Sequence, residues 1–167
     1  MFAALHKQVQ APCRIRDESA HGLWAWRQAC RQFHEFSSPM FELVSDAGLA
    51  SIAAGDPKMV ERAICFLEVA PFHFRSGYDK VVLIRRLKRI PLDLRQQSRL
   101  RSVVFHALDD HDRVEYRHYC RLAASVQTPE FIERIRERLD SPDAGVRRRA
   151  RSLIDYLEHF NRSDRNA

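Results

Sequence analysis

The 167-residue sequence has little of the material from which strands and tight turns are built. Threonine occurs once, at Thr128, and glycine only five times. Strands favour β-branched residues and tight hairpins need glycine, whereas the abundant alanine and leucine favour helices. The composition therefore predicts an all-α protein. The length fits a single domain that can bury a hydrophobic core of its own.

Closely spaced cysteines and long apolar runs are also missing. The four cysteines form no CxxC or CxxxC pair, which excludes the usual signatures of a zinc site or a redox motif: Cys13, Cys30, Cys65 and Cys120. No stretch has the length needed to cross a bilayer, and the apolar patch in MFAALHKQVQAP is too short for a secretory signal. We therefore expect a cytoplasmic protein with no cofactor and no membrane partner.

Motifs of common catalytic sites are absent as well. No serine lies in a GxSxG elbow, and there is no glycine-rich phosphate loop. Cys120 has a histidine two positions before it, His118, but residues two apart on a helix point in different directions. We expect Cys120 to pack in the core. These absences favour a protein without enzymatic activity, although the sequence does not decide the point.

Helix starts are well marked by side chains that can cap a helix just before a proline. These pairs are Ser38 with Pro39, Asp56 with Pro57, Thr128 with Pro129, and Ser141 with Pro142, and Asp112 followed by Glu115 resembles a capping box. Apolar spacing between these marks predicts helices over about 19–36, 39–54, 57–70, 78–90, 92–108, 113–126, 129–140 and 143–160. Residues 18–160 would form one helical domain, with flexible segments at 1–17 and 161–167.

One pattern of residues occurs three times. Each copy begins with an aspartate and continues with apolar residues at helical spacing, except at Gln96: Asp56, Met59, Ala63, Phe66, Leu67; Asp93, Gln96, Leu100, Val103, Val104; and Asp143, Val146, Ala150, Leu153, Ile154. The repetition predicts helical hairpins 39–54 with 57–70, 78–90 with 92–108, and 129–140 with 143–160, leaving 113–126 unpaired. The first helix, with its aromatic residues, would cover the end of the stack: Trp24, Trp26, Phe33 and Phe36.

The last copy of this pattern resembles the HEAT-like family of α-helical repeats. In LDSPDAGVRRRARSLIDYL, residues 139–157, the turn Asp143, the pair Val146 and Arg147, Ala150 and Leu153 follow the family's second-helix pattern. The other copies have Val60 and Gln97 where the family has arginine. The resemblance covers about residues 39–160. It implies an irregular right-handed α-solenoid with second helices on its inner face, used mostly to bind proteins and in some relatives nucleic acid.

Positive charge is concentrated in the middle of the chain. Residues 75–101 hold nine basic and two acidic residues, a net +7, whereas the whole chain carries +6. If helices 78–90 and 92–108 are adjacent, their basic rows would form one ridge that binds an acidic protein surface or a phosphate backbone. Alternatively, the same residues could be an ordinary solvated face, and the excess of arginine could reflect gene composition. The predicted contact residues are Arg85, Lys88, Arg89, Arg95 and Arg99, joined by Arg148 and Arg151.

Two enzymatic alternatives rest on weaker patterns. His111 and Asp112 resemble metal ligands of HD-domain phosphohydrolases, but a polar turn with a helix cap at Asp112 is the simpler explanation. Some HEAT-like proteins are DNA glycosylases, which need aromatic and acidic groups in a basic groove. The candidates by residue type are Trp24, Trp26, Asp79 and Asp93. A small stack with exposed apolar edges could also form a homodimer.

Overall fold

The computed structural model describes residues 19, 21–25, 27–28, 39–69, 76–109 and 115–164, and all regular structure in these ranges is helical. The elements are α3 Pro39–Val44, α4 Asp46–Ala53, α5 Pro57–Val69, α6 Ser76–Leu87, α7 Leu94–Asp109, α8 Tyr116–Val126, α9 Pro129–Arg136, the 3-10 helix η1 Glu137–Asp140, and α10 Ala144–Asp164. The predicted all-α class is thereby confirmed for the described part of the chain. None of the helices in these ranges is both long and apolar enough to cross a bilayer.

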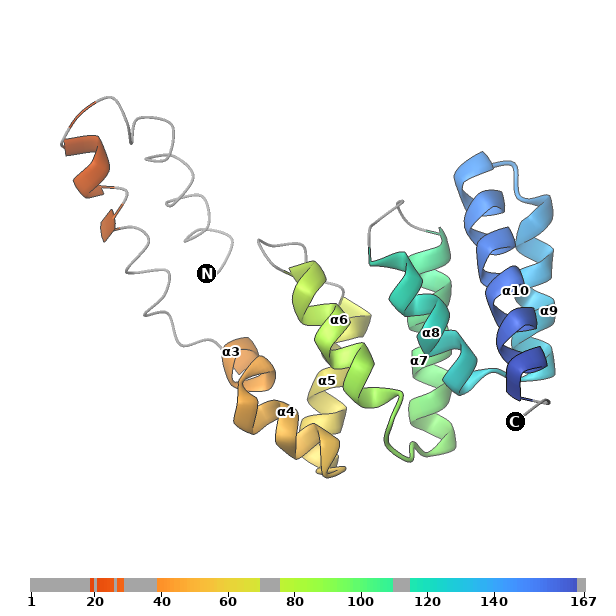
Figure 1. Cartoon of the computed structure of the whole chain (residues 1–167), viewed down its shortest axis with the longest axis horizontal. Helices are drawn as coiled ribbons and strands as arrows, with labels where there is room; N and C mark the ends of the chain where they lie inside the picture. Colours follow the sequence, from red (N-terminus) through yellow and green to blue (C-terminus); the bar gives the residue numbers. More distant parts are fainter. Residues whose placement is uncertain are drawn as a thin grey trace.

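The helices form two layers that face each other (Figure 1). In one layer α4 packs on α6, α6 on α8, and α8 on α10. In the other layer α5 packs on α7, and α7 reaches α9 through an edge-to-face contact of Phe105 with Phe131, whose ring centroids are 5.1 Å apart. The chain alternates between the layers from α4 to α10. Its buried core lies between them, and includes Ile64, Leu100 and Leu122 with no exposed surface.

The three aspartates of the repeated pattern each cap a helix in the same way. Oδ1 of Asp56 accepts the backbone N–H of Met59 at 2.8 Å, and the carboxylates of Asp93 and Asp143 likewise accept the N–H three residues on. The apolar positions that follow are mainly buried in all three helices, α5, α7 and α10. The pattern thus marks a capped helix with one buried face.

Gln96 departs from the apolar pattern for a local reason. Its backbone N–H donates to Oδ1 of Asp93 at 2.7 Å, while its side-chain Oε1 accepts the N–H of Asp93 at 3.1 Å. This reciprocal arrangement is a capping box, in which two amides without helical partners are satisfied together. The polar residue therefore strengthens the start of α7.

Two of the copies also share a side-chain contact at the position directly after the second residue of the pattern. Arg147 donates through Nη1 to the carbonyl of Pro142 at 2.9 Å, and Gln97 donates through Nε2 to the carbonyl of Leu92 at 2.8 Å. Both side chains thus bind the carbonyl just before the capping aspartate. Val60, at the same position of the first copy, has no side-chain donor.

Several predicted helix boundaries are wrong. The predicted helix 39–54 divides at Ser45, whose hydroxyl accepts the N–H of Gly48 at 3.1 Å and starts α4 anew. Gly48 fits closely there, since a Cβ atom would clash with the carbonyl oxygen of Glu42. In addition, α6 ends at Leu87 rather than 90, because a residue that precedes proline, here Pro91, disfavours the helical conformation.

The last helix also differs from the prediction at both ends. Pro142 lies outside α10, because Asp143 rather than Ser141 provides the cap. The helix then runs on to Asp164 instead of ending at 160, and Gln127 hydrogen bonds to Asn161 at 2.8 Å. Residues 161–164, predicted to belong to a flexible tail, are therefore helical.

The predicted pairing of helices is wrong in the middle of the chain. α6 packs on α3, α4, α5 and α8, whereas α7 packs on α5, α8 and α10, so α6 and α7 do not form a hairpin. The helix expected to be unpaired, α8, packs extensively on α7. Because α8 adds one helix between the second and third copies, α10 lies in the layer opposite the one that holds α5 and α7. The three copies therefore do not occupy equivalent layers.

Some predictions concern residues outside the described ranges. These are the segment 1–17, the aromatic residues Trp26, Phe33 and Phe36, and the helix cap at Asp112. Within the first predicted helix, residues 21–25 are helical and Ser19 accepts the N–H of Gly22 at 3.0 Å. The side chain of Trp24 is 59% exposed.

Candidate basic interface

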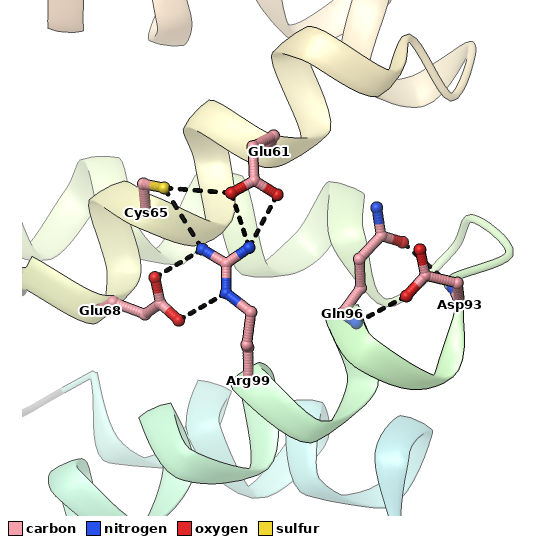
Figure 2. A network of polar contacts seen from close by, with 6 residues as sticks. All are labelled: Glu61, Cys65, Glu68, Asp93, Gln96 and Arg99. Atoms are coloured by element: carbon pink, nitrogen blue, oxygen red, sulfur yellow. Dashed lines mark hydrogen bonds and ion pairs between the residues drawn. The ribbon is translucent and has the colours of Figure 1, made fainter.

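Arg99 is neutralised by two carboxylates of the neighbouring helix (Figure 2). Its guanidinium donates to Glu61 at 2.6 Å and to Glu68 at 2.6 Å, with both oxygens of each carboxylate engaged. It also lies 3.3 Å from Sγ of Cys65. These hydrogen bonds lower the pKa of both glutamates and raise the pKa of Arg99. Arg99 thus joins α7 to α5.

Arg95 belongs to the same neighbourhood. It is exposed near the start of α7, and its charge contributes to the lowered pKa of Glu61, after the hydrogen bonds from Arg99 and Cys65. Together with Arg99 it faces the acidic side of α5. The structure therefore does not bring these two arginines together with the basic residues of α6.

The basic residues of α6 instead lie beside α8. The side chains concerned are Arg85 on α6, Lys88 and Arg89 in the turn that follows, and Arg117 and Arg121 on α8; we call these five the α6–α8 basic cluster. Lys88 has a lowered pKa, first because of partial burial and then because of the charges of Arg121, Arg89 and Arg85. A lysine whose ammonium form is disfavoured by three arginines lies in a strongly positive environment.

The buried side chain of His118 lies in the positive electrostatic field of the same cluster. Its side chain is 3% exposed, and its pKa is lowered first by burial and then by Arg85, Arg121, Arg117 and Lys88. Nε2 accepts from Nε of Arg117 at 3.4 Å, while the buried Nδ1 has no hydrogen-bond partner within the described part of the chain. The imidazole is therefore held neutral among four cations.

The cluster has no acidic partner in the described ranges of the chain. No carboxylate there lies within ion-pairing distance of Arg85, Lys88, Arg89, Arg117 or Arg121. Four of these side chains are exposed, and Lys88 is partly buried. The contrast with Arg99 is clear, because that residue has two carboxylates of its own. Among the residues that the structure describes, the positive charge of this surface is thus left uncompensated.

A half-open pocket of about 480 Å³ lies at the edge of the cluster, between α6 and α8. Its wall combines apolar and polar side chains and is formed by Gly77, Tyr78, Val81, Val82, Arg85, Glu115, Arg117 and His118. Tyr78 is 75% exposed. The carboxylate of Glu115 lies against Gly77, where an added Cβ atom would come within 3.3 Å of Oε1. The pocket therefore offers apolar surface next to arginine.

The remaining predicted contact residues lie elsewhere. Arg148 and Arg151 are exposed on α10, which packs on α8 but not on α6. Sequence reasoning missed Arg117 and Arg121, because the helix that carries them was expected to be unpaired. Their spacing of four residues, which places them along one side of a helix, was the available signal.

The residues considered for catalysis have other environments. His111 and Asp112 lie outside the described ranges, and no three metal-ligating side chains gather within those ranges. Asp93 caps α7. Burial raises the pKa of the Cys120 thiol to about 11, which suits a residue in the core and disfavours the reactive thiolate.

Comparisons of the chain with family models, with curated proteins and with solved structures found no match.

Proposed function

We propose that the protein is a non-enzymatic binding module of the HEAT-like solenoid kind, which holds an acidic segment of a partner protein against the α6–α8 basic cluster. One observation carries the proposal: five cations gather on α6, the turn that follows it and α8, without an acidic partner in the described ranges. Mutual repulsion of like charges reduces the stability of the folded chain, whereas a bound acidic segment would relieve it.

The two-layer arrangement and the repeated pattern support the solenoid part of this proposal. Alternating helices with short connections are what helical-repeat proteins use to build extended binding surfaces. The shared carbonyl contact of Arg147 and Gln97 adds to this, because glutamine performs at the second copy the contact that arginine makes at the third. This shared contact supports treating the second and third copies as variants of one pattern.

The pocket favours a protein partner over nucleic acid. A phosphate backbone presents charge with no apolar side chains, and it would leave Tyr78, Val81 and Val82 unused. A peptide segment can present carboxylates and apolar side chains together. Duplex nucleic acid is accordingly the competing outcome in the test.

The test compares two variants with the same change in net charge. Arg85→Glu with Arg89→Glu alters the cluster, while Arg151→Glu with Arg162→Glu alters exposed positions of α10. Fluorescence anisotropy would measure binding of labelled polyglutamate and of a labelled DNA duplex, each as a function of salt. We expect polyglutamate to bind at low salt, the cluster variant to lose at least about tenfold in affinity, and the α10 variant to change little.

Two results would overturn the proposal. Equal losses in both variants would mean that net charge alone drives binding. Tighter binding of the duplex than of polyglutamate would identify a phosphate-binding surface instead. In that case the logarithm of the binding constant should depend less steeply on the logarithm of the salt concentration in the Arg85→Glu, Arg89→Glu variant.

A further inference from the structure

We infer that the pocket between α6 and α8 receives an apolar side chain of the bound acidic segment, so that the partner carries an apolar anchor with carboxylates beside it. This inference rests on the proposed function, since the same segment occupies the cluster and the pocket. Charge alone attracts an acidic segment without fixing its position, whereas an apolar side chain in the pocket would fix it.

The pocket wall along α6 has the order that such an anchor requires. Tyr78, Val81, Val82 and Arg85 stand at positions i, i+3, i+4 and i+7, which lie along one side of a helix. An apolar strip thus leads directly to an arginine. With a rise of about 1.5 Å per residue, Tyr78 and Arg85 are separated by about 10 Å along the axis.

This separation sets the expected spacing in the partner. An extended peptide advances about 3.3 Å per residue, so roughly three residues span the distance from the apolar end to Arg85. A carboxylate about three positions from the anchor would therefore meet Arg85. On the α8 side, Arg117 lines the same pocket and can meet a second carboxylate.

His118 is the buried polar residue of the pocket wall. It lines the pocket, is 3% exposed, and its Nδ1 has no hydrogen-bond partner within the described residues. Because Nε2 accepts from Arg117, the proton of the neutral ring lies on Nδ1. Nδ1 itself has no exposed surface, so a bound segment would act on the ring through its charge rather than through a hydrogen bond to this atom.

The neighbouring charges favour an acidic segment over other apolar ligands. Arg85 and Lys88 on one side, and Arg117 and Arg121 on the other, all act on His118. Among the described residues of the wall, Glu115 is the single acidic one, and it lies at the Gly77 end, beside the apolar strip. The carboxylates of the segment would thus meet the arginine end, away from Glu115.

The test uses two labelled peptides of equal charge. In the first, one phenylalanine is flanked on both sides by blocks of aspartate and glutamate; in the second, serine replaces the phenylalanine. We expect the phenylalanine peptide to bind the full chain about tenfold more tightly, because part of an aromatic side chain is removed from water. Tyr78→Ala should abolish this preference while leaving the salt-dependent binding of the serine peptide.

Leu94→Ala serves as the matched control, because Leu94 is 81% exposed on α7 and lies away from the pocket lining. It should leave the preference intact. As a second readout, NMR titration of the His118 ring should show its pKa rising when the phenylalanine peptide binds, since carboxylates then oppose the surrounding cations.

The outcomes separate this inference from the proposal beneath it. If both peptides bind equally in a salt-dependent manner, the pocket inference fails and the proposed function stands. If the preference survives Tyr78→Ala, the anchor lies elsewhere and the inference is again overturned. If neither peptide binds at low salt, the proposed function itself fails.

Discussion

Replacing Arg99 with leucine should destabilise the protein without weakening its binding to acidic ligands. The guanidinium is 20% exposed and pairs with Glu61 and Glu68, which are 51% and 34% exposed. Partly exposed ion pairs contribute up to about 1 kcal/mol each. Their loss, with some repulsion between the two glutamates left behind, should lower the free energy of unfolding by about 2 kcal/mol.

Thermal and urea unfolding would measure this effect. For a domain of this size, about 2 kcal/mol corresponds to a fall in Tm of about 4–8 °C. Glu61→Gln with Glu68→Gln, added to Arg99→Leu, should restore part of the loss, because the carboxylates no longer face each other. At about 1 M salt the loss should shrink, since the screening length falls to about 3 Å.

The same variant distinguishes the two basic regions. Arg99→Leu should bind polyglutamate as the unaltered protein does, whereas Arg85→Glu with Arg89→Glu should lose binding and keep or gain stability. A change in unfolding free energy below about 0.5 kcal/mol for Arg99→Leu would refute the structural role, because ordinary surface substitutions fall in that range. If Arg99→Leu lost polyglutamate binding while its stability stayed unchanged, Arg99 would belong to the ligand-contact surface.

Three further predictions concern buried groups. Because the pKa of His118 is lowered, its neutral form contributes stability that is complete above about pH 6.5 and is lost as the pH falls. His118→Leu should therefore reduce the fall in unfolding free energy below that pH by up to about 1.4 kcal/mol per pH unit. Parallel curves for the variant and the unaltered protein would contradict this. Arg149 is 6% exposed and donates to the carbonyl of Leu108 at 2.7 Å. Arg149→Met should therefore lower the free energy of unfolding, measured with urea, by about 1.5–3 kcal/mol. The control Arg151→Met, at an exposed position, should change it little. In a variant with Cys13 and Cys30 replaced by serine, a thiol reagent should label exposed Cys65 rapidly and buried Cys120 only after unfolding. Equal labelling rates for the two cysteines would contradict the burial and the raised pKa of Cys120.

The local features of the fold could be predicted because their causes lie within a few residues. Asp56 and Asp93 cap the helices that follow them through amides three residues away, so the sequence alone contains both partners. The same holds for Thr128, which accepts the N–H of Phe131. Where prediction failed locally, as at Ser45, two locally plausible structures competed, a continuous helix and a new cap.

The layer of each helix and the partner of each charge could not be predicted, because they depend on distant parts of the chain. Arg99 meets Glu68 and Glu61 from 31 and 38 residues away, and no periodicity within α7 indicates this. Adjacency in sequence suggested that α6 and α7 share a surface, but α6 packs on α8 instead. The candidate site therefore combines three residues predicted from sequence, Arg85, Lys88 and Arg89, with two residues supplied by α8.

The two basic regions differ in a way that links stability to function. On α7, Arg99 is surrounded by carboxylates, and its positive charge contributes to folding. Beside α8, Arg85 and Arg121 act unfavourably on Lys88, and no described carboxylate offsets them. A ligand that supplies the missing negative charge would bind only the folded chain, because unfolding disperses the cluster. Such a ligand must raise Tm, and must do so more at low salt than at high salt.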